Sequence, residues 1–444
     1  MGYNELLDFC APYITDGEGR RRTMRLRVKN VGILSDSEIE IAGITVVAGE
    51  NNTGKSTFGK ALYSVFSALS HLGEHVELVK RQYAVRVATI AYADSRRLSS
   101  EDWFESVCDK LMENKLTEDL VDEIIESCPE DLSNGNDFFI RKTQEIIYTS
   151  DDEIERRLVL NSFGGEFRNQ VQNQLHREED SRVDLIIKNY PISVVIRNES
   201  IQSLDGIIDL GHVPVYIDEF TSSFGNNKFS QFSRWSASYQ HNVNLYNIIN
   251  SKLIGEKSIR EDDKDSRVIQ DILNDQLLKP VYDRLCEICH GSLRRVEKSI
   301  KFVDDAMPGV QLDMLNVSSG LKTFLILQEL IRNGTICENG TLIMDEPEVH
   351  LHPQWQVVLA EMVVLLQKAL RLHVLITSHS PYFISAIDVF AKKHGVIENN
   401  RYYFSSRKGN SVDVKDVTNE ICVIYDSLAA PYQTIQDEAN RVEE

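Results

Sequence analysis

Residues Ile44 to Thr57 read ITVVAGENNTGKST. The apolar, β-branched run at the start of this stretch predicts a buried strand. The eight residues that follow match the phosphate-binding pattern G-x-x-x-x-G-K-[ST], and apolar residues at helical spacing come next. This strand–loop–helix order predicts a nucleotide site in an α/β protein. The candidate phosphate-binding residues are Gly49, Glu50, Asn51, Asn52, Thr53, Gly54, Lys55, Ser56 and Thr57.

Each residue type in this loop suits a polyphosphate. Gly49 and Gly54 allow the backbone to wrap the anion with its N–H groups pointing inward, and the following helix places its positive end on the same charge. Asn52 stands where many such loops carry glycine, and asparagine tolerates positive φ better than most residues. Lys55 is expected to bind the β- and γ-phosphates, and the Ser56 hydroxyl is expected to ligate Mg²⁺.

Composition limits the class of protein. The chain has 444 residues, 42% of them hydrophobic, and a formal net charge of −20. The charge argues against broad attraction to nucleic acid, although Arg294, Arg295, Lys298 and Lys301 form a local basic group. No long apolar run is present, so we expect a soluble, cytoplasmic protein without membrane contact. The pattern Cys286-Glu-Ile-Cys289-His290 stands alone, which disfavours a haem or zinc site.

Changes in pattern along the chain predict large helical insertions in a nucleotide-binding fold. Breaks are expected near Ser133 and at Gly164-Gly165. Neither insertion has a sustained heptad, which favours helical bundles, and their acidic runs predict solvated faces or a partner-docking surface. The predicted units are an N-terminal extension (1–23), the first part of a nucleotide-binding head (24–69), a helical insertion (70–181), head strands (182–224), a second helical insertion (225–297) and the rest of the head (298–444).

Three further motifs contain residues suited to nucleotide chemistry. Ser318-Ser319-Gly320 precedes a predicted helix, and a buried strand ends in Asp345-Glu346. A second buried strand, 373–378, is followed by His379. The first of two adjacent acids at a strand end is expected to hold Mg²⁺, and the second to orient or deprotonate the attacking water.

Together these motifs resemble the ABC-type ATPases of the branch that includes RecF, the SMC proteins and the OLD nucleases. The resemblance covers residues 24–69 and 300–424, and it implies an ABC-type P-loop ATPase head that uses ATP and Mg²⁺. It identifies 49–57 as the Walker A loop, Asp345 as the Walker B aspartate, Glu346 as the catalytic glutamate and His379 as the switch histidine. Residues 318–320 resemble the signature motif, which in this family contacts ATP on the opposite protomer. A head-to-head dimer or higher oligomer is therefore implied.

Two segments near these motifs allow alternatives. The run from Glu348 through His350 and His352 resembles the family segment that lines the dimer interface, although its alternating acid and histidines also suggest a metal site. The family glutamine that touches Mg²⁺ is expected just after Ile217. The sequence has Asp218-Glu219 there.

The segment after the switch histidine separates this chain from the OLD nucleases. Residues 380–444 have no Asp-x-Asp pattern of a TOPRIM nuclease domain, and the chain has no H-N-H pattern. The chain thus resembles the stand-alone ATPases of bacterial anti-phage systems such as Septu, which pair with a separate effector, in that case a nuclease. We expect such a defence ATPase. The alternatives are a RecF- or SMC-like DNA repair ATPase and a non-hydrolysing ATP-bound scaffold.

Overall fold

The structure is a computed structural model that describes residues 24–92, 101–218, 240–255, 278–296, 299–307, 309–409 and 411–443. The predicted N-terminal extension 1–23 lies outside these ranges. Glu219 and Lys298 lie outside them too.

A six-stranded sheet forms the centre of the molecule, in the order β14-β13-β3-β12-β11-β7. All neighbours are parallel except the edge pair β13 and β14. β3 leads into the phosphate loop, and β11 and β12 end at Asp345 and Ser378, so the carboxyl ends of three neighbouring strands converge on one edge. The strands are β3 (Ile44–Gly49), β7 (Val215–Ile217), β11 (Thr341–Asp345), β12 (His373–Ser378), β13 (Arg401–Lys408) and β14 (Ser411–Asp416).

Both faces of this sheet are buried, as its continuous apolar strands require. Val46 of β3 faces one core, which it shares with several helices, whereas Val47 faces a second core with helix α2. This alternation follows from the two-residue period of a strand. The helices of the first core include α10 (Ser319–Arg332), α11 (Pro353–Leu370) and α12 (Pro381–His394), and α2 spans Lys55–Leu69.

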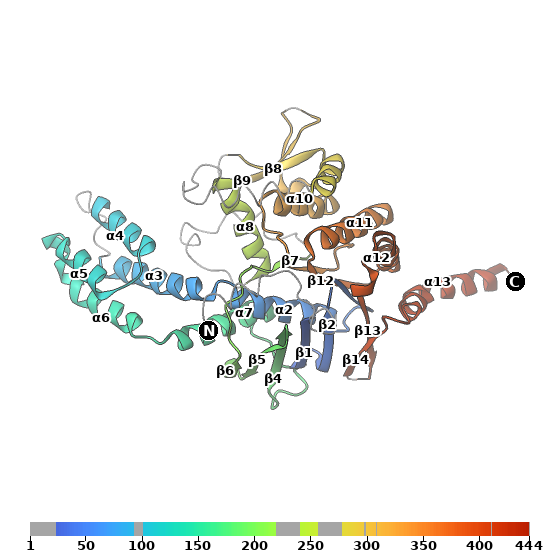
Figure 1. The fold of residues 1–444 in the computed structure, drawn as a ribbon, viewed down its shortest axis with the longest axis horizontal. Coiled ribbons are helices and arrows are strands. Elements are labelled where there is room, and N and C mark those ends of the chain that lie inside the picture. The colour runs from blue at the N-terminus through green and yellow to red at the C-terminus, as the bar shows by residue number, and fades with distance from the viewer. Residues whose placement is uncertain are drawn as a thin grey trace.

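An antiparallel sheet in the order β2-β1-β4-β5-β6 completes the second core. It joins segments that lie far apart in the sequence, since β1 pairs with both β2 and β4. Figure 1 shows this sheet below α2. Its strands are β1 (Met24–Val31), β2 (Leu34–Ile41), β4 (Ser181–Ile187), β5 (Tyr190–Arg197) and β6 (Ser200–Asp205).

A helical lobe with its own core extends to one side (Figure 1). It contains α3 (Leu72–Ala91), α4 (Glu101–Glu113), α5 (Glu118–Glu126), the short η2 (Glu130–Gly135) and α6 (Asn136–Ile147), while α7 (Asp151–Phe167) returns to the second core. The break expected at Gly164-Gly165 is wrong because both residues lie inside α7. Phe163 is fully buried there and its ring stacks on Phe167. Such burial outweighs the cost of about 1 kcal/mol for each helical glycine.

The second insertion contains α8 (His241–Gly255) and a helix over 278–289. The expectation of helix to 297 is wrong at its end, where β8 (Gly291–Val296) pairs with β9 (Ser299–Asp304), and β9 pairs with β10 (Gln311–Asp313). Residues of β8 alternate, with Leu293 buried, so a strand fits this short segment better. Arg294 of the basic group lies opposite Lys301 and forms an ion pair with Asp305.

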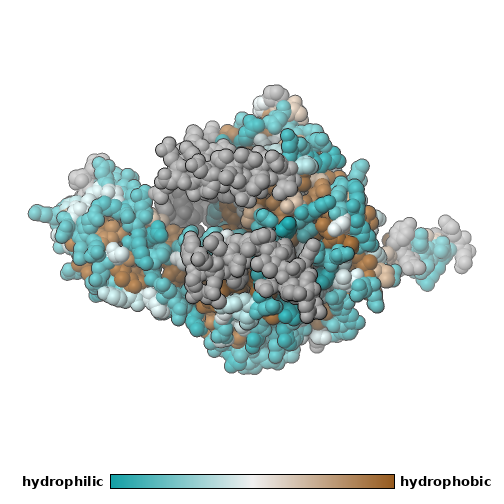
Figure 2. Space-filling view, viewed as in Figure 1, coloured by the Kyte–Doolittle hydropathy of each residue, from teal (hydrophilic) through white to brown (hydrophobic). Residues whose placement is uncertain are grey.

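The last helix, α13 (Cys422–Glu443), projects from the body toward the C-terminus (Figure 1). Hydrophilic residues dominate much of the described surface in Figure 2, around smaller apolar patches. Among the described residues, no helix combines the length and hydropathy needed to cross a bilayer.

Candidate functional site

The phosphate loop has the backbone conformation expected from its glycines. Gly49, Asn52 and Gly54 have φ of 151°, 60° and 79°. A Cβ on Gly49 would lie 2.2 Å from the Ser405 carbonyl oxygen, which excludes other residues there. The Ser405 hydroxyl also donates to the carbonyl of Thr53 at 2.6 Å, so β13 holds the loop. Asn52 thus adopts the positive φ predicted from its type.

The hydrogen-bond donors of the loop indicate that it can bind an anion. Within the described part of the chain, no hydrogen bond uses the backbone N–H groups of residues 51–54. Lys55 is only 3% exposed, and its Nζ donates to the Glu50 carbonyl at 2.6 Å. Burial lowers the pKa of Lys55, and the Glu346 carboxylate opposes this effect. A bound phosphate would supply negative charge next to the buried Lys55 ammonium and acceptors for these backbone N–H groups.

Asp345 is held by three hydroxyl groups. Ser56 Oγ donates to its Oδ1 at 2.9 Å, and the Tyr216 hydroxyl donates to its Oδ2 at 3.2 Å. Thr377 donates to Oδ1 from the neighbouring strand β12. The Ser56 hydroxyl and the Asp345 carboxylate are hard oxygen donors, which is the ligand chemistry that Mg²⁺ prefers. Burial raises the pKa of Tyr216, and this keeps its hydroxyl a donor.

Glu346 lies between the loop and the tip of β12. Its Oε1 is 3.7 Å from Lys55 Nζ and 3.5 Å from His379 Nδ1. Its backbone has φ of 48° and donates to the Thr377 carbonyl at 3.0 Å. This uncommon conformation directs Glu346 away from the path of β11 and next to the cation of the phosphate loop.

Glu348 supports the segment that carries His379. Its side chain is 2% exposed, and its Oε1 accepts from Ser378 Oγ at 2.5 Å and from the backbone N–H groups of His379 and Ser380 at 3.0 and 3.2 Å. Burial raises the pKa of Glu348, whereas these donors lower it. Glu348 therefore fixes the position of the histidine from inside the fold.

We expect Glu348→Ala to lower the free energy of unfolding by about 2–4 kcal/mol, because it leaves buried donors without their acceptor. ATP hydrolysis should fall as well, since His379 loses its support. Chemical denaturation followed by circular dichroism measures the first effect. Glu398→Ala, on the short η6 (Ile397–Asn399), is the control. Equal free energies of unfolding for Glu348→Ala and Glu398→Ala would contradict the proposed support of His379 by Glu348.

In the part of the chain that the structure describes, the side chains of the two possible metal motifs make other contacts or are buried. Among the described residues, no group of three or more His, Cys, Asp or Glu side chains is arranged to hold a metal. In the Glu348–His352 run, Glu348 binds internal donors, and His352 Nδ1 caps α11 by accepting from a backbone N–H. Burial raises the pKa of Cys289 to about 12, which disfavours a thiolate ligand.

The signature residues do not join this cluster. Ser318 is the N-cap of α10, which packs in the first core, whereas the phosphate loop leads into α2 in the second. Ser318 is exposed, and Ser319 and Gly320 are partly exposed. The structure thus brings together Lys55, Ser56, Asp345, Glu346 and His379, and no hydrogen bond or ion pair among the described residues joins the signature motif to them.

Sequence reasoning missed Tyr216 and Thr377, which lie on buried strands without a motif. Position in the strand was the available signal for Thr377, because it lies two residues before His379. Asp218 stands where the family glutamine was expected, and its Oδ2 lies 2.8 Å from Nε2 of His241. Asp218 is therefore engaged with a histidine of α8.

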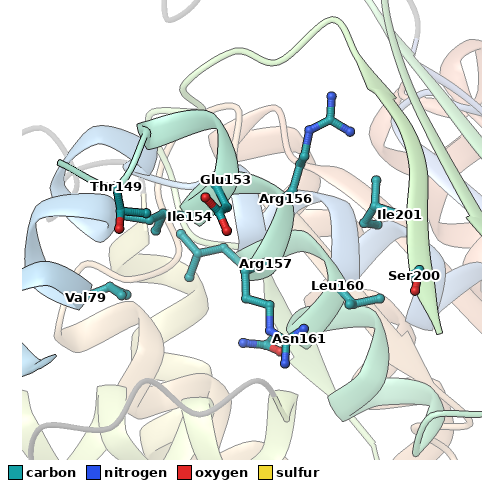
Figure 3. A pocket seen from close by; sticks show the side chains of 11 residues that line it. Val79, Thr149, Glu153, Ile154, Arg156, Arg157, Leu160, Asn161, Ser200 and Ile201 are labelled. Atoms are coloured by element: carbon teal, nitrogen blue, oxygen red, sulfur yellow. The ribbon is translucent and has the colours of Figure 1, made fainter. Parts of the chain in front are cut away.

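Two cavities lie away from these motif residues. One of about 530 Å³ is lined by residues of α3, α7 and β6. In Figure 3 the Arg157 side chain lies beside Asn161, while Arg156 points away from it. The other, of about 650 Å³, lies between the end of α2, α3 and α8. Neither is lined by a candidate ATP-site residue.

Most of the chain matches a known protein family. The family model described as an AAA ATPase domain matches residues 24–384. Similar solved structures include an SMC head domain from Thermotoga maritima (11% identity, TM-score 0.36, 89% of this chain and 99% of that chain). An SMC head bound to the C-terminal winged-helix domain of ScpA has 12% identity and a TM-score of 0.40 over 90% of this chain and 99% of that chain. A search of curated proteins finds no significant match.

Proposed function

This chain belongs to the AAA ATPase domain family, and we propose that it is the ATP-hydrolysing subunit of a bacterial anti-phage defence complex. In this complex it would hold or activate a separate, nuclease-type effector. The observation that carries the enzymatic part is the convergence of Glu346 with Lys55 and His379, within 3.7 and 3.5 Å. A scaffold that only binds ATP has no need of this carboxylate.

The proposed steps assign one role to each group. The loop amides and Lys55 bind the phosphates, and Ser56 and Asp345 would hold Mg²⁺, which neutralises charge on the phosphate oxygens. Glu346 orients the attacking water and accepts its proton. His379, 40% exposed at the end of β12, then lies where it can contact the γ-phosphate and report its loss.

We also propose that two copies enclose the ATP. The exposed signature residues begin α10, a helix of 14 residues whose positive end suits a phosphate. Two apolar side chains next to α10 are exposed, Leu315 just before it in the sequence (52%) and Trp355 of α11 (39%). Trp355 packs on Phe324 of α10, so the two apolar residues flank the same helix. Such a surface suits a contact with a second head.

The separate effector leads to a direct prediction. The purified chain with Mg²⁺ or Mn²⁺ should cleave neither DNA nor RNA, because the described residues contain no further metal-binding cluster of acids. Incubation with labelled single- and double-stranded substrates measures this. Metal-dependent cleavage that persists in Lys55→Ala would contradict the assignment, since that activity would be independent of ATP.

Protection against phage tests the biological role. Cells that carry this gene with its neighbouring genes should resist infection, and Lys55→Ala should remove the resistance. A neighbouring nuclease gene would agree with this proposal. Loss of DNA repair in the variant, without any change in phage resistance, would favour a repair ATPase.

A further inference from the structure

A buried polar cluster lies directly behind Asp345. His241, the first residue of α8, is 9% exposed, and Glu166 of α7 is 6% exposed. Glu166 accepts from the backbone N–H of His241 at 2.7 Å, and its other oxygen lies 2.7 Å from Nδ1 of the same residue. One carboxylate of α7 therefore fixes both the backbone and the ring of His241.

A second carboxylate binds the opposite side of the ring. Asp218 Oδ2 lies 2.8 Å from His241 Nε2. Burial alone would lower the pKa of His241, but the Asp218 and Glu166 carboxylates outweigh it and raise the pKa to about 9. The ring is thus held between two acids from different elements, α7 and the segment after β7.

Tyr216 connects this cluster to the ATP site. Its ring stacks on His241, with centroids 4.1 Å apart and planes at 21°. Its hydroxyl donates to Asp345 Oδ2, while Ser56 donates to Oδ1. The tyrosine is 1% exposed, so its ring has little freedom to move independently of the histidine.

We propose that Tyr216 is a positioning residue for the magnesium carboxylate of Asp345, and that the Glu166–His241–Asp218 cluster holds Tyr216 in place. The inference rests on the proposed function, in which Asp345 holds Mg²⁺. A carboxylate with one oxygen fixed by Tyr216 presents the other toward Ser56 and the metal. The cluster also joins α7 and α8 to this carboxylate, so the two insertions contribute to the ATP site.

Tyr216→Phe tests the proposal because it removes a single oxygen atom and keeps the stacked ring. We expect Mn²⁺ binding, measured by EPR with a non-hydrolysable ATP analogue, to weaken about tenfold, as expected for a lost hydrogen bond to a charged group. Hydrolysis should need more Mg²⁺ and recover toward the wild-type rate at saturation. A structural defect would not recover in this way.

Tyr63→Phe is the matched control. Tyr63 is 1% exposed and also contacts the His241 ring, but its hydroxyl accepts from Asn244 instead of bonding Asp345. This variant also loses one buried hydroxyl, and its Mn²⁺ affinity should stay at the wild-type value. Equal losses in Tyr63→Phe and Tyr216→Phe would show a general packing effect and overturn the proposal.

Asp218→Asn tests the link through His241. Asp218 is 30% exposed, so the substitution is expected to fold, and it should weaken Mn²⁺ binding about two- to threefold. If it acts through Tyr216, the double variant with Tyr216→Phe should bind no more weakly than Tyr216→Phe alone. Additive losses would instead show that Asp218 acts independently of Tyr216 and would contradict the proposed link.

Binding measurements on the wild-type protein distinguish a failure of the proposed ATPase function from a failure of the positioning role of Tyr216. If it binds neither the ATP analogue nor Mn²⁺, the proposed ATPase function fails. If it binds both and Tyr216→Phe has the same Mn²⁺ affinity, the positioning role alone fails.

Discussion

Lys55→Ala should abolish nucleotide binding. The ammonium is 3% exposed and lies in the loop where phosphates would bind, 3.7 Å from Glu346 Oε1. Its loss removes the charge that offsets this carboxylate as well as the phosphates, so the site becomes net repulsive to ATP. Titration with a fluorescent ATP analogue measures the affinity, which we expect to fall by at least about 100-fold.

Lys60→Ala provides the control for this variant. Lys60 lies on the same helix, α2, about 1.4 turns from Lys55, and is not part of the motif. Its removal changes the net charge equally and should leave affinity unchanged. A folded Lys55→Ala protein with wild-type ATP affinity would refute the assignment of the phosphate loop.

Glu346→Gln should separate binding from hydrolysis. Glutamine keeps the size of the side chain and can still hydrogen-bond the attacking water, but it cannot accept a proton. Loss of a general base costs about 10²–10⁴ in rate. Lys55, Ser56 and Asp345 remain, so ATP should still bind, and an ATP-dependent assembly should last longer than in the wild type. Phosphate release and light scattering with ATP measure the two effects.

Ser319→Arg should prevent ATP-dependent assembly, whereas Glu346→Gln should prolong it. The arginine places bulk and charge at the start of α10, where we propose that the γ-phosphate of a second copy is approached. This variant should lose hydrolysis and fail to assemble with ATP. If neither Glu346→Gln nor Ser319→Arg alters ATP-dependent assembly, the shared-site proposal is wrong for this chain.

The α/β class, the P-loop head and the helical insertions were predictable because they depend on local patterns. The strand–loop–helix order of 44–69 defines the fold. Because neighbouring parallel strands end at the same edge of a sheet, the acids at the end of β11 and His379 after β12 lie close together. These predictions of fold are confirmed by the structure and by the family match. The roles of the site residues stay predictions.

The features that the sequence did not predict depend on long-range packing. Gly164 stays helical because burial of its neighbours overrides its low propensity, and β8 forms because β9 pairs with it. Tyr216 and His241 are 25 positions apart in the sequence, and only the stacking of their rings identifies the cluster. Contacts of this kind leave no periodic signal in one sequence.

Steady-state phosphate release per molecule, measured with saturating Mg²⁺ and ATP over a range of protein concentrations, tests the central claim most directly. Wild-type turnover should exceed that of Glu346→Gln by about 100-fold or more and should rise with protein concentration, because two copies complete each site. Wild-type release no faster than that of Glu346→Gln would contradict the proposal that this chain is an ATPase using Glu346.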